Sequence, residues 1–294
     1  KVPLKTENNK VLYVWFDAPI GYISATKSWA KKNNKDWKKY WKNTETKLVH
    51  FIGKDNIVFH CIIFPSMLKA HGEFILPHNV PANEFLNLGG KKISTSKNWA
   101  VWLNEYIDDF PNKQDVLRYV LCTNAPENKD NDFTWSDFQT KNNSELVAIL
   151  GNFINRVFVL CHKYWDGKVP KINQILSTDS EVIDSIKLTT EKISENIKNY
   201  KFRFAIQKFM ELARTGNKYL ADTEPWKLFK NDDTKHRTET ILHIAIQITA
   251  AISITSEPFM PFTSKKIKNM LNILDPKWEE AGKISIINEN HKLN

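Results

Sequence analysis

A basic, hydroxyl-rich run that follows two glycines is the stretch of this chain best suited to contact a polyphosphate. It reads Lys-Lys-Ile-Ser-Thr-Ser-Lys at residues 91–97, directly after Gly89 and Gly90. Glycine lets a backbone adopt conformations closed to other residues, and lysine and hydroxyl side chains supply charged and neutral donors. We therefore interpret residues 91–97 as a candidate phosphate-binding loop. A solvated basic loop without a ligand has the same composition.

A second group of candidates lies at residues 15–22, which read Trp-Phe-Asp-Ala-Pro-Ile-Gly-Tyr. An apolar, strand-like run ends here and a helical pattern begins. Ligands of open α/β sheets bind outside the carboxyl ends of the strands. Trp15, Pro19 and Tyr22 are therefore candidates for the walls of a small apolar pocket. The alternative is that Trp15 and Phe16 are ordinary core residues.

The same order of strand, tight turn and helix recurs at residues 51–60. Gly53 at the strand end permits close approach of a ligand to the backbone, and Asp55 can accept hydrogen bonds from ribose hydroxyls. Asp55 is also a typical helix cap, and His60 taken alone is also typical of a hydrogen-bonded core histidine. Both interpretations of each residue stay open at this point.

The second half of the chain carries residues of the types that read RNA bases. Asn152 and Arg156 are one helical turn apart and share a face, and Trp226 follows Pro225 at a predicted helix start. Asn and Arg can hydrogen-bond to base edges, and an exposed Trp stacks on an unpaired base. The alternative is a bundle with one buried tryptophan and one surface arginine. Residues 115–119 (Asp-Val-Leu-Arg-Tyr) predict only helix packing and a local charge pair.

Periodicity predicts the elements that position these residues. Strand patterns alternate with helical patterns over residues 1–125, which predicts an α/β domain with a parallel sheet. The expected strands are 11–16, 48–53 and 85–88, and the expected helices are 17–32 and 55–71. Polar residues with a proline then predict a linker at 126–140. Apolar stripes at helical spacing predict an antiparallel, all-α bundle over 141–294.

Composition favours a nucleic-acid partner in a reducing compartment. The chain has 294 residues, a net charge of +9 and 35 aromatic side chains, so both charge and stacking surfaces are abundant. Three dispersed cysteines without a Cys-x-x-Cys pair predict neither a disulfide scaffold nor a local zinc site, and we expect a cytoplasmic protein. The apolar run at 241–254 contains His, Gln and Thr, which predicts a core helix rather than a membrane span. The first residue is Lys1, and we expect the chain to be an internal fragment of a longer protein.

Taken together and in this order, these pieces resemble the methionyl-tRNA synthetases. The run at 15–22, the Phe-Ile-Gly-Lys-Asp run at 51–55, the loop at 91–97 and the Asp-x-Leu-Arg-Tyr run at 115–119 carry the resemblance. Class I synthetases have Lys-Met-Ser-Lys-Ser where this chain has residues 92–96. The run at 15–22 is much more specific to the methionine enzymes. The resemblance covers nearly the whole chain, from the second half of a Rossmann-like catalytic domain through an anticodon-binding bundle.

The resemblance implies an activity and a role for each candidate residue. Methionine attacks ATP, bound with Mg²⁺ as substrate, to give methionyl-adenylate, and the methionyl group then passes to its tRNA. The implied methionine-binding residues are Trp15, Ala18, Pro19, Tyr22, His60 and Phe64. The implied ATP-binding residues are Gly53, Asp55, Lys92 and Thr95, and Lys92, Ser94 and Ser96 are the implied catalytic residues. Asn152, Arg156, Pro225 and Trp226 are implied to read the CAU anticodon.

Departures from the family pattern lead to two further expectations. Thr95 replaces the second lysine of the loop and brings no charge, so we expect Lys91 or Lys97 to supply it. The family's His-Ile-Gly-His element is absent from these residues, and any zinc site of the family would lie upstream. We therefore expect this fragment alone not to form methionyl-adenylate. The alternatives are a leucyl, isoleucyl or valyl enzyme, a non-catalytic tRNA-binding module, and a basic protein without a tRNA role.

Overall fold

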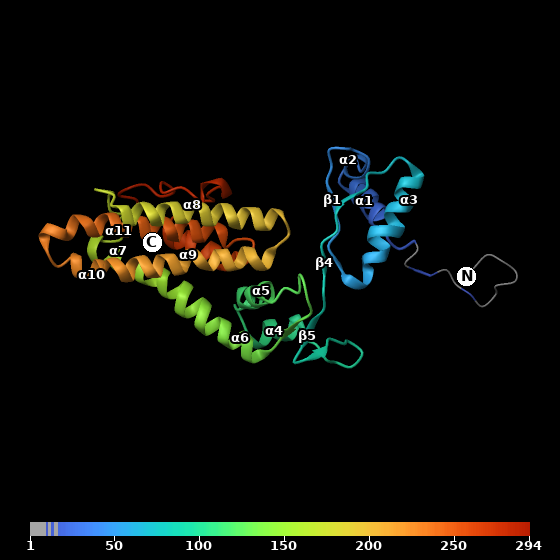
Figure 1. Ribbon diagram of the computed structural model, residues 1–294, viewed down its shortest axis with the longest axis horizontal. Helices are drawn as coiled ribbons and strands as arrows, with labels where there is room; N and C mark the ends of the chain where they lie inside the picture. Colours follow the sequence, from blue (N-terminus) through green and yellow to red (C-terminus); the bar gives the residue numbers. More distant parts are fainter. Residues whose placement is uncertain (1–9, 11–12, 15–16) are drawn as a thin grey trace. The chain divides into compact units, whose positions relative to one another are not determined.

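The computed structural model describes residues 10, 13–14 and 17–294, which form two compact units (Figure 1). The first unit contains residues up to 85 together with 126–131, and the second contains 86–125 and 132–294. Residues 86–125 thus pack with the helical bundle, whereas the sequence analysis assigned them to the α/β domain. Each unit has its own core.

The first unit contains short parallel strand pairs and helices. Its helices are α1 (Ile20–Lys32), α2 (Lys38–Trp41) and α3 (Phe64–His71), and its strands are β1 (Leu48–Val49), β2 (Ile52–Gly53), β3 (Pro77–Asn79) and β4 (Ala82–Asn83). Strand β1 pairs with β3 and β2 with β4, both in parallel, which confirms the α/β expectation in its coarse form. Between β2 and α3 the chain forms a 3₁₀ turn (Lys54–Asn56) and a π-helical turn (Phe59–Ile63). The predicted helix at 55–71 is therefore a series of three helical types.

The strand expected at residues 11–16 lies largely outside the described residues. Tyr13 and Val14, which are described, are 66% and 63% exposed and belong to no strand, so the prediction of a buried strand is wrong at these two positions. The strand expected at 48–53 is interrupted between β1 and β2, where the backbone N–H of His50 donates to Asn79 O at 3.1 Å and that of Ile52 to Pro81 O at 3.1 Å. The core of this unit is an aromatic-rich cluster of Ile23, Trp41, Phe64 and Leu68.

The second unit joins a small sheet to a set of long helices. Strand β5 (Leu86–Leu88) lies between β6 (Lys91–Lys92) and β7 (Asn131–Phe133). The helices are α4 (Leu103–Asp109), α5 (Gln114–Thr123), α6 (Trp135–Lys141), α7 (Asn152–Trp165), α8 (Ser177–Lys198), α9 (Phe202–Thr223), α10 (Pro225–Leu228), α11 (Asp232–Thr255) and α12 (Pro261–Leu271). A π-helix (Asn142–Gly151) joins α6 to α7, and a 3₁₀ turn (Trp278–Glu280) lies in the carboxy-terminal segment.

Residues 126–140, predicted as a linker, contain β7 and most of α6. The Thr134 hydroxyl accepts the backbone N–H of Asp137 at 3.1 Å and so caps α6. Trp135 stacks on Phe110, with ring centroids 5.5 Å apart, and Phe138 packs edge-on against Tyr106. The polar run before Thr134 indicated a break in the chain, but the sequence does not reveal these aromatic contacts, which come from residues about 25 positions earlier.

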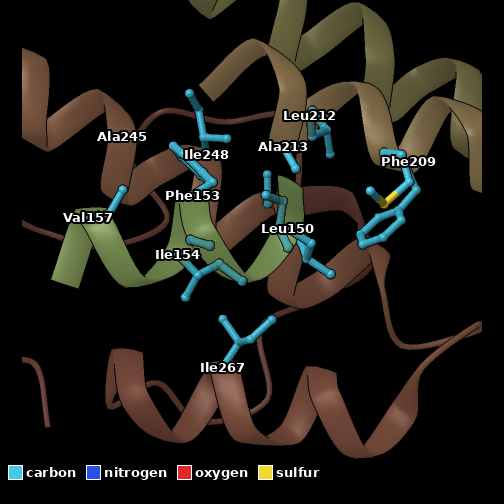
Figure 2. Packing of buried hydrophobic residues seen from close by; sticks show 14 of the residues in the cluster. Leu150, Phe153, Ile154, Val157, Phe209, Leu212, Ala213, Ala245, Ile248 and Ile267 are labelled. Carbon is cyan, nitrogen blue, oxygen red and sulfur yellow. The ribbon is translucent and has the colours of Figure 1, made fainter. Parts of the chain in front are cut away.

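Helix α11 forms the centre of the bundle. Its side chains from Ile241 to Thr255 are all buried, and α7, α8, α9, α10 and α12 all pack against it (Figure 1). Figure 2 shows Ala245 and Ile248 of α11 among side chains from α7 and α9. Two helical stretches, 135–165 and 232–255, are long and apolar enough to cross a membrane, and the apolar window of the second is 94% buried inside the protein. Residues 241–254 are thus a core helix, as the sequence predicted.

Candidate functional sites

An aromatic cluster in the first unit contains most of the described candidates from residues 15–22 and the following helix. We use this name for Tyr22, His50, His60 and Phe64, whose ring centroids lie 5.4 to 6.5 Å from one another where pairs are in contact. Tyr22 is 42% exposed, whereas His60 and Phe64 are each 1% exposed. The cluster therefore has buried rings behind and one tyrosine facing outward.

The remaining members of the candidate methionine pocket lie next to the start of α1. Pro19 is buried and provides the N-cap position of α1, and Ala18 is half-buried. Helix α1 then presents Tyr22 one turn into the helix, on the side that faces His60. Trp15, the first residue of the candidate pocket, lies outside the described residues.

Two hydrogen bonds orient the ring of His60. Its Nδ1 lies 3.0 Å from the carbonyl oxygen of Asn56, which can only accept, so Nδ1 carries the proton. Its Nε2 lies 2.9 Å from the Tyr22 hydroxyl and, in the neutral ring, accepts the proton of that hydroxyl. The tyrosine oxygen is left with its lone pairs available outward. The arrangement fixes the tyrosine ring next to a buried imidazole.

His50 belongs to this cluster, although the sequence analysis did not single it out. It lies between β1 and β2 and is 8% exposed. Burial lowers the pKa of His50 below its ordinary value, and the nearby His60 lowers it further. Its buried Nε2 has no hydrogen-bond partner in the part of the chain that the structure describes. The sequence signal for His50 was its place in the Val-His-Phe-Ile-Gly run, one residue after an apolar pair.

Gly53 and Asp55, the candidate nucleotide-binding residues, lie at the carboxyl end of β2. A Cβ atom on Gly53 would come within 2.7 Å of the Asp55 carboxylate oxygen, so a larger residue here would displace that side chain. The Asp55 side chain is exposed and lies in the first turn of the 3₁₀ helix. Gly53 pairs with Asn83 of β4, so β2 and β4 end side by side.

Lys54, between these two residues, points into an ion-pair network. Its ammonium contacts Glu84 and lies 2.8 Å from Asp130, whose carboxylate also accepts the backbone N–H of Phe85 at 3.0 Å. The hydrogen bond to Asp130, followed by that to Glu84, raises the pKa of Lys54, and the bond from Lys54 lowers the pKa of Asp130. Lys54 therefore ties the turn to Glu84 and Asp130, whereas the Asp55 side chain faces solvent.

The candidate phosphate loop belongs to the second unit and begins in a tight hairpin. Gly89 and Gly90 both have positive φ angles, 57° and 75°, as a two-residue turn of this hand requires. Asp132 accepts the N–H of Gly90 at 3.0 Å, which ties the hairpin to β7. Lys92, Thr95 and Ser96 are exposed after this turn, and Ser94 is half-buried.

A tryptophan closes the loop. Ser94 and Trp99 exchange two backbone hydrogen bonds of 2.9 Å, and the Trp99 indole donates to Leu88 O at 2.9 Å. The Ser94 and Ser96 hydroxyls are 3.2 Å apart, so both lie on one side of the loop. Asn98, with a φ of 49°, completes the turn by donating its N–H to Thr95 O. Trp99, which the sequence analysis did not single out, thus fixes the loop's base.

The two lysines proposed to replace the family lysine differ in their surroundings. The Lys91 ammonium lies over the Trp99 ring, 5.3 Å from its centroid. Lys97 lies in the turn between Thr95 and Asn98 and is exposed. Of the two, Lys97 is therefore the lysine whose side chain is not held against a ring of the described residues and can extend toward a ligand of the loop.

Two of the candidate anticodon residues, Arg156 of α7 and Trp226 of α10, are in contact in the second unit. The Arg156 guanidinium lies over the Trp226 ring, 5.0 Å from its centroid, and both residues are half-buried. Pro225 is buried and begins α10, which presents Trp226. Asn152 is exposed, and its amide lies 3.5 Å from Asn217 Oδ1. The Asn217 amide is in turn held by Ile149 O and Ala213 O.

The Asp-x-Leu-Arg-Tyr run of α5 connects the sheet region of the second unit to its bundle. The Asp115 carboxylate accepts the N–H of Thr263 at 2.6 Å, and Arg118 donates to the carbonyls of Pro258 and Phe259 at 2.9 Å. Tyr119 donates to Glu145, and burial together with this carboxylate raises the tyrosine's pKa. The predicted local charge pair within α5 is therefore replaced by bonds across about 140 residues of sequence. Among the described residues, no three His, Cys, Asp or Glu side chains gather into a metal site.

Comparisons with known proteins place both halves of the chain in one enzyme family. The family described as class I tRNA synthetases (M) matches residues 1–158, and the anticodon-binding domain of methionyl-tRNA ligase matches 169–292. A methionine–tRNA ligase from Christiangramia forsetii is 61% identical over 99% of this chain, and one from Bacteroides fragilis is 56% identical over 100%. The chain spans 43% and 42% of the lengths of those relatives.

The fold has a close counterpart among solved structures. A Mycobacterium tuberculosis methionyl-tRNA synthetase in complex with methionyl-adenylate superposes with a TM-score of 0.81. The superposition covers 96% of this chain and 54% of that protein, at 24% identity. Since the first family match alone covers more than half of the chain, the chain belongs to the methionyl group of the class I tRNA synthetases.

Proposed function

We propose that this chain is part of a cytoplasmic enzyme that uses ATP to attach methionine to its tRNA through methionyl-adenylate. Family membership supports this proposal, and so does the arrangement of Tyr22, His60 and Asn56 at the aromatic cluster. That hydrogen-bonded relay is the single structural observation on which the choice of amino acid rests.

The aromatic cluster suits a methionine side chain. A thioether is polarizable, apolar and attracted to aromatic edges, and Tyr22, Phe64 and Pro19 supply such surroundings together with Ala18. Because both ring nitrogens of His60 are engaged by Tyr22 and Asn56, the imidazole leaves the pocket wall to the aromatic faces. In our proposal, Trp15 would add a further aromatic wall.

The two polar sites suit the nucleotide. In our proposal, Gly53 allows the adenosine to approach the backbone and Asp55 accepts the ribose hydroxyls. Lys92, Ser94, Thr95 and Ser96 contact the phosphates of ATP, which binds with Mg²⁺ as substrate. The methionine carboxylate attacks the α-phosphate and pyrophosphate leaves, without a covalent enzyme intermediate. The protein's contribution is then orientation and stabilisation of the developing charge.

The patch of Arg156, Trp226 and Asn152 suits unpaired bases. The Arg156 guanidinium holds one face of the Trp226 ring, and the half-exposed indole offers stacking surface to a base. Asn152 and Arg156 can hydrogen-bond to base edges. We propose that the patch reads the CAU anticodon of the methionine tRNA.

Amino-acid-dependent pyrophosphate exchange tests the catalytic half of the proposal. The full-length enzyme containing this chain should exchange pyrophosphate with methionine and far more slowly with leucine, isoleucine or valine. Tyr22→Phe should raise the KM for methionine, because it removes the hydroxyl and leaves His60 Nε2 buried without a partner. Preference for one of the three branched amino acids would overturn the assignment.

Binding of anticodon stem-loops tests the other half. Trp226→Ala should weaken binding of a CAU stem-loop by about 1–3 kcal/mol, the usual contribution of a stacked base. Trp226→Phe, which retains a stacking face, should retain most of the affinity. Equal affinity of the alanine variant and the wild type would contradict the assigned role of Trp226.

A further inference from the structure

A second cation–aromatic arrangement lies at the same end of the bundle as the anticodon patch. The rings of Tyr164 and Phe229 stack with centroids 3.8 Å apart and planes 15° apart. The Lys163 ammonium lies 5.4 Å from the centre of the Tyr164 ring, and the Lys235 ammonium 5.0 Å from that of Phe229. We call these four residues the lysine–ring sandwich. Its members come from α7, the α10–α11 turn and the start of α11 (Figure 1).

The stacked rings orient the two ammonium groups. Because the inner face of each ring covers the other ring, each ammonium approaches its ring from outside the stack. Trp165 packs edge-on against Phe229, with centroids 5.3 Å apart, and so holds that ring in place. Cation–π contacts restrict the lysine rotamers before any ligand binds, which reduces the entropy lost on binding.

Both ammonium groups are available to an anion. Lys163 and Lys235 are exposed, and within the described part of the chain neither lies within 4.0 Å of a carboxylate. Some lysines of this chain are instead held in ion pairs, for example Lys54, Lys141 and Lys268. A pair of exposed, pre-oriented and unpaired lysines on an aromatic support is a binding arrangement for phosphate groups.

The lysine–ring sandwich lies further along the same two elements, α7 and the α10 segment, that carry Arg156 and Trp226. Lys163 follows Arg156 by seven residues on α7, which places it on the same face about 10 Å further along the helix axis. Phe229 follows Trp226 by three residues, one turn later in the α10 segment. An RNA strand whose bases meet Arg156 and Trp226 would therefore extend its backbone toward the sandwich.

We propose that the lysine–ring sandwich is a phosphate clamp for the backbone of the anticodon loop, outside the three bases of the anticodon. This inference rests on the proposed tRNA-binding function. The clamp adds affinity and fixes the register of the loop, and it does not read sequence, because phosphate contacts carry no base information. Base discrimination is left to Asn152, Arg156 and Trp226.

The test measures binding of anticodon stem-loops to the full-length enzyme as a function of salt. One stem-loop carries CAU and a second carries an unrelated anticodon. Lys163→Ala and Lys235→Ala should each weaken binding of both stem-loops by the same factor, about threefold, and lower the slope of log Kd against log salt by about 0.7–0.9. Preference for CAU should stay unchanged in both variants.

Two further variants separate the clamp from general charge and from misfolding. Lys230→Ala removes an exposed lysine of the same turn that makes no ring contact, and should change the slope less than Lys235→Ala. Phe229→Ala leaves every charge in place but removes the support of Lys235, and should weaken binding, whereas Phe229→Tyr should restore it. A restored affinity in the tyrosine variant excludes a folding defect as the cause.

Failure of the inference and failure of the proposed function give different results. If the wild type prefers CAU but Lys163→Ala, Lys235→Ala and Phe229→Ala bind with unchanged affinity and slope, the clamp is overturned while the anticodon assignment stands. If Lys163→Ala or Lys235→Ala alters the preference for CAU, the residue reads bases and the clamp is likewise wrong. If the wild type shows no preference for CAU, the proposed function itself fails.

Discussion

Tyr22 and His60 show how single residues acquire a functional property from neighbours that are distant in sequence. They are 38 residues apart, yet a hydrogen bond joins the Tyr22 hydroxyl to the imidazole and holds the exposed ring against the buried one. The carbonyl of Asn56, within the same turn as His60, completes the relay. Neither residue type alone would have indicated this pairing.

His50 leads to a prediction about pH. Its pKa is lowered in the folded protein, chiefly by burial, so the unfolded chain binds the proton more readily below pH 6.5. Stability of the first unit should therefore be fully present above pH 6.5 and should decline as the pH falls below that value. Urea unfolding of the full-length enzyme at pH 7.5 and pH 5.5, followed by fluorescence of the aromatic residues, measures the decline.

A matched variant isolates the contribution of His50. Its replacement by Gln removes the titrating group and retains an amide, so the pH dependence should become shallower in His50→Gln. An unchanged pH dependence in this variant would show that other groups cause the decline.

Lys97 leads to a prediction about the charge that Thr95 lacks. Lys91 is held over the Trp99 ring, whereas Lys97 is exposed in the turn that follows Thr95. We therefore expect Lys97→Ala to lower kcat for pyrophosphate exchange about tenfold or more, as loss of a charge that stabilises the transition state does. Lys91→Ala should have a smaller effect on kcat. Rescue by Lys97→Arg would support a charge role, and equal rates for wild type and Lys97→Ala would rule it out.

At the scale of elements, α7 and α9 pack so closely that one position excludes a side chain. A Cβ atom on Gly216 of α9 would come within 2.3 Å of the Phe153 ring of α7. Figure 2 shows Phe153 among Ala213 and Ile248 in this part of the core. The close approach sets how α7, with Asn152 and Arg156, lies against the bundle.

Gly216→Ala should therefore destabilise the protein, although alanine favours helices more than glycine does. The helix propensity gain is about 1 kcal/mol, and forcing a methyl group into a packed core costs about 1–3 kcal/mol or more. Denaturant unfolding of Gly216→Ala measures the net loss. Combining it with Phe153→Leu, which shortens the opposing side chain, should recover part of the loss, and strict additivity of the two changes would contradict this explanation.

Helix α5 illustrates how an element can serve two regions of one unit. Its Asp115 accepts the N–H of Thr263 at the start of α12, and its Arg118 binds the carbonyls of Pro258 and Phe259. Leu117 and Leu121 meanwhile line a small apolar cavity of about 130 Å³ that also includes Ile93 of the phosphate loop. The helix thus shares a cavity with the loop and is hydrogen-bonded to the bundle.

At the scale of the whole molecule, the chain covers less than half the length of its 61% identical relative. We expect this fragment alone not to catalyse methionine-dependent pyrophosphate exchange, because the His-Ile-Gly-His element of the family is absent from it. It should nevertheless bind a CAU stem-loop, since the anticodon patch and its supporting helices belong to one unit. Exchange by the isolated fragment at a rate comparable with the full-length enzyme would disprove the first expectation.

Local sequence was sufficient to predict those features that depend on neighbouring residues. Apolar residues at helical spacing predicted the bundle, and the long apolar run at 241–254 predicted its central helix, because the buried residues of α11 are consecutive in sequence. Gly89 and Gly90 predicted a special turn, because positive φ angles are a property of glycine itself. The order of the short motifs predicted the family, because each motif is a run of neighbouring residues that can be compared with the family's own runs without knowing the fold.

Tertiary structure alone decided the contacts that join distant segments. The linker expected at 126–140 became β7 and α6 because Trp135 and Phe138 pack against Tyr106 and Phe110. Asp115 and Arg118, expected to pair with each other, bind backbone groups about 140 residues away. The place of His50 in the aromatic cluster and the stacking of Tyr164 on Phe229 likewise have no local signature. The physical reason is the same in each case: side-chain type fixes what a group can bind, and only the folded chain decides which partner comes within reach.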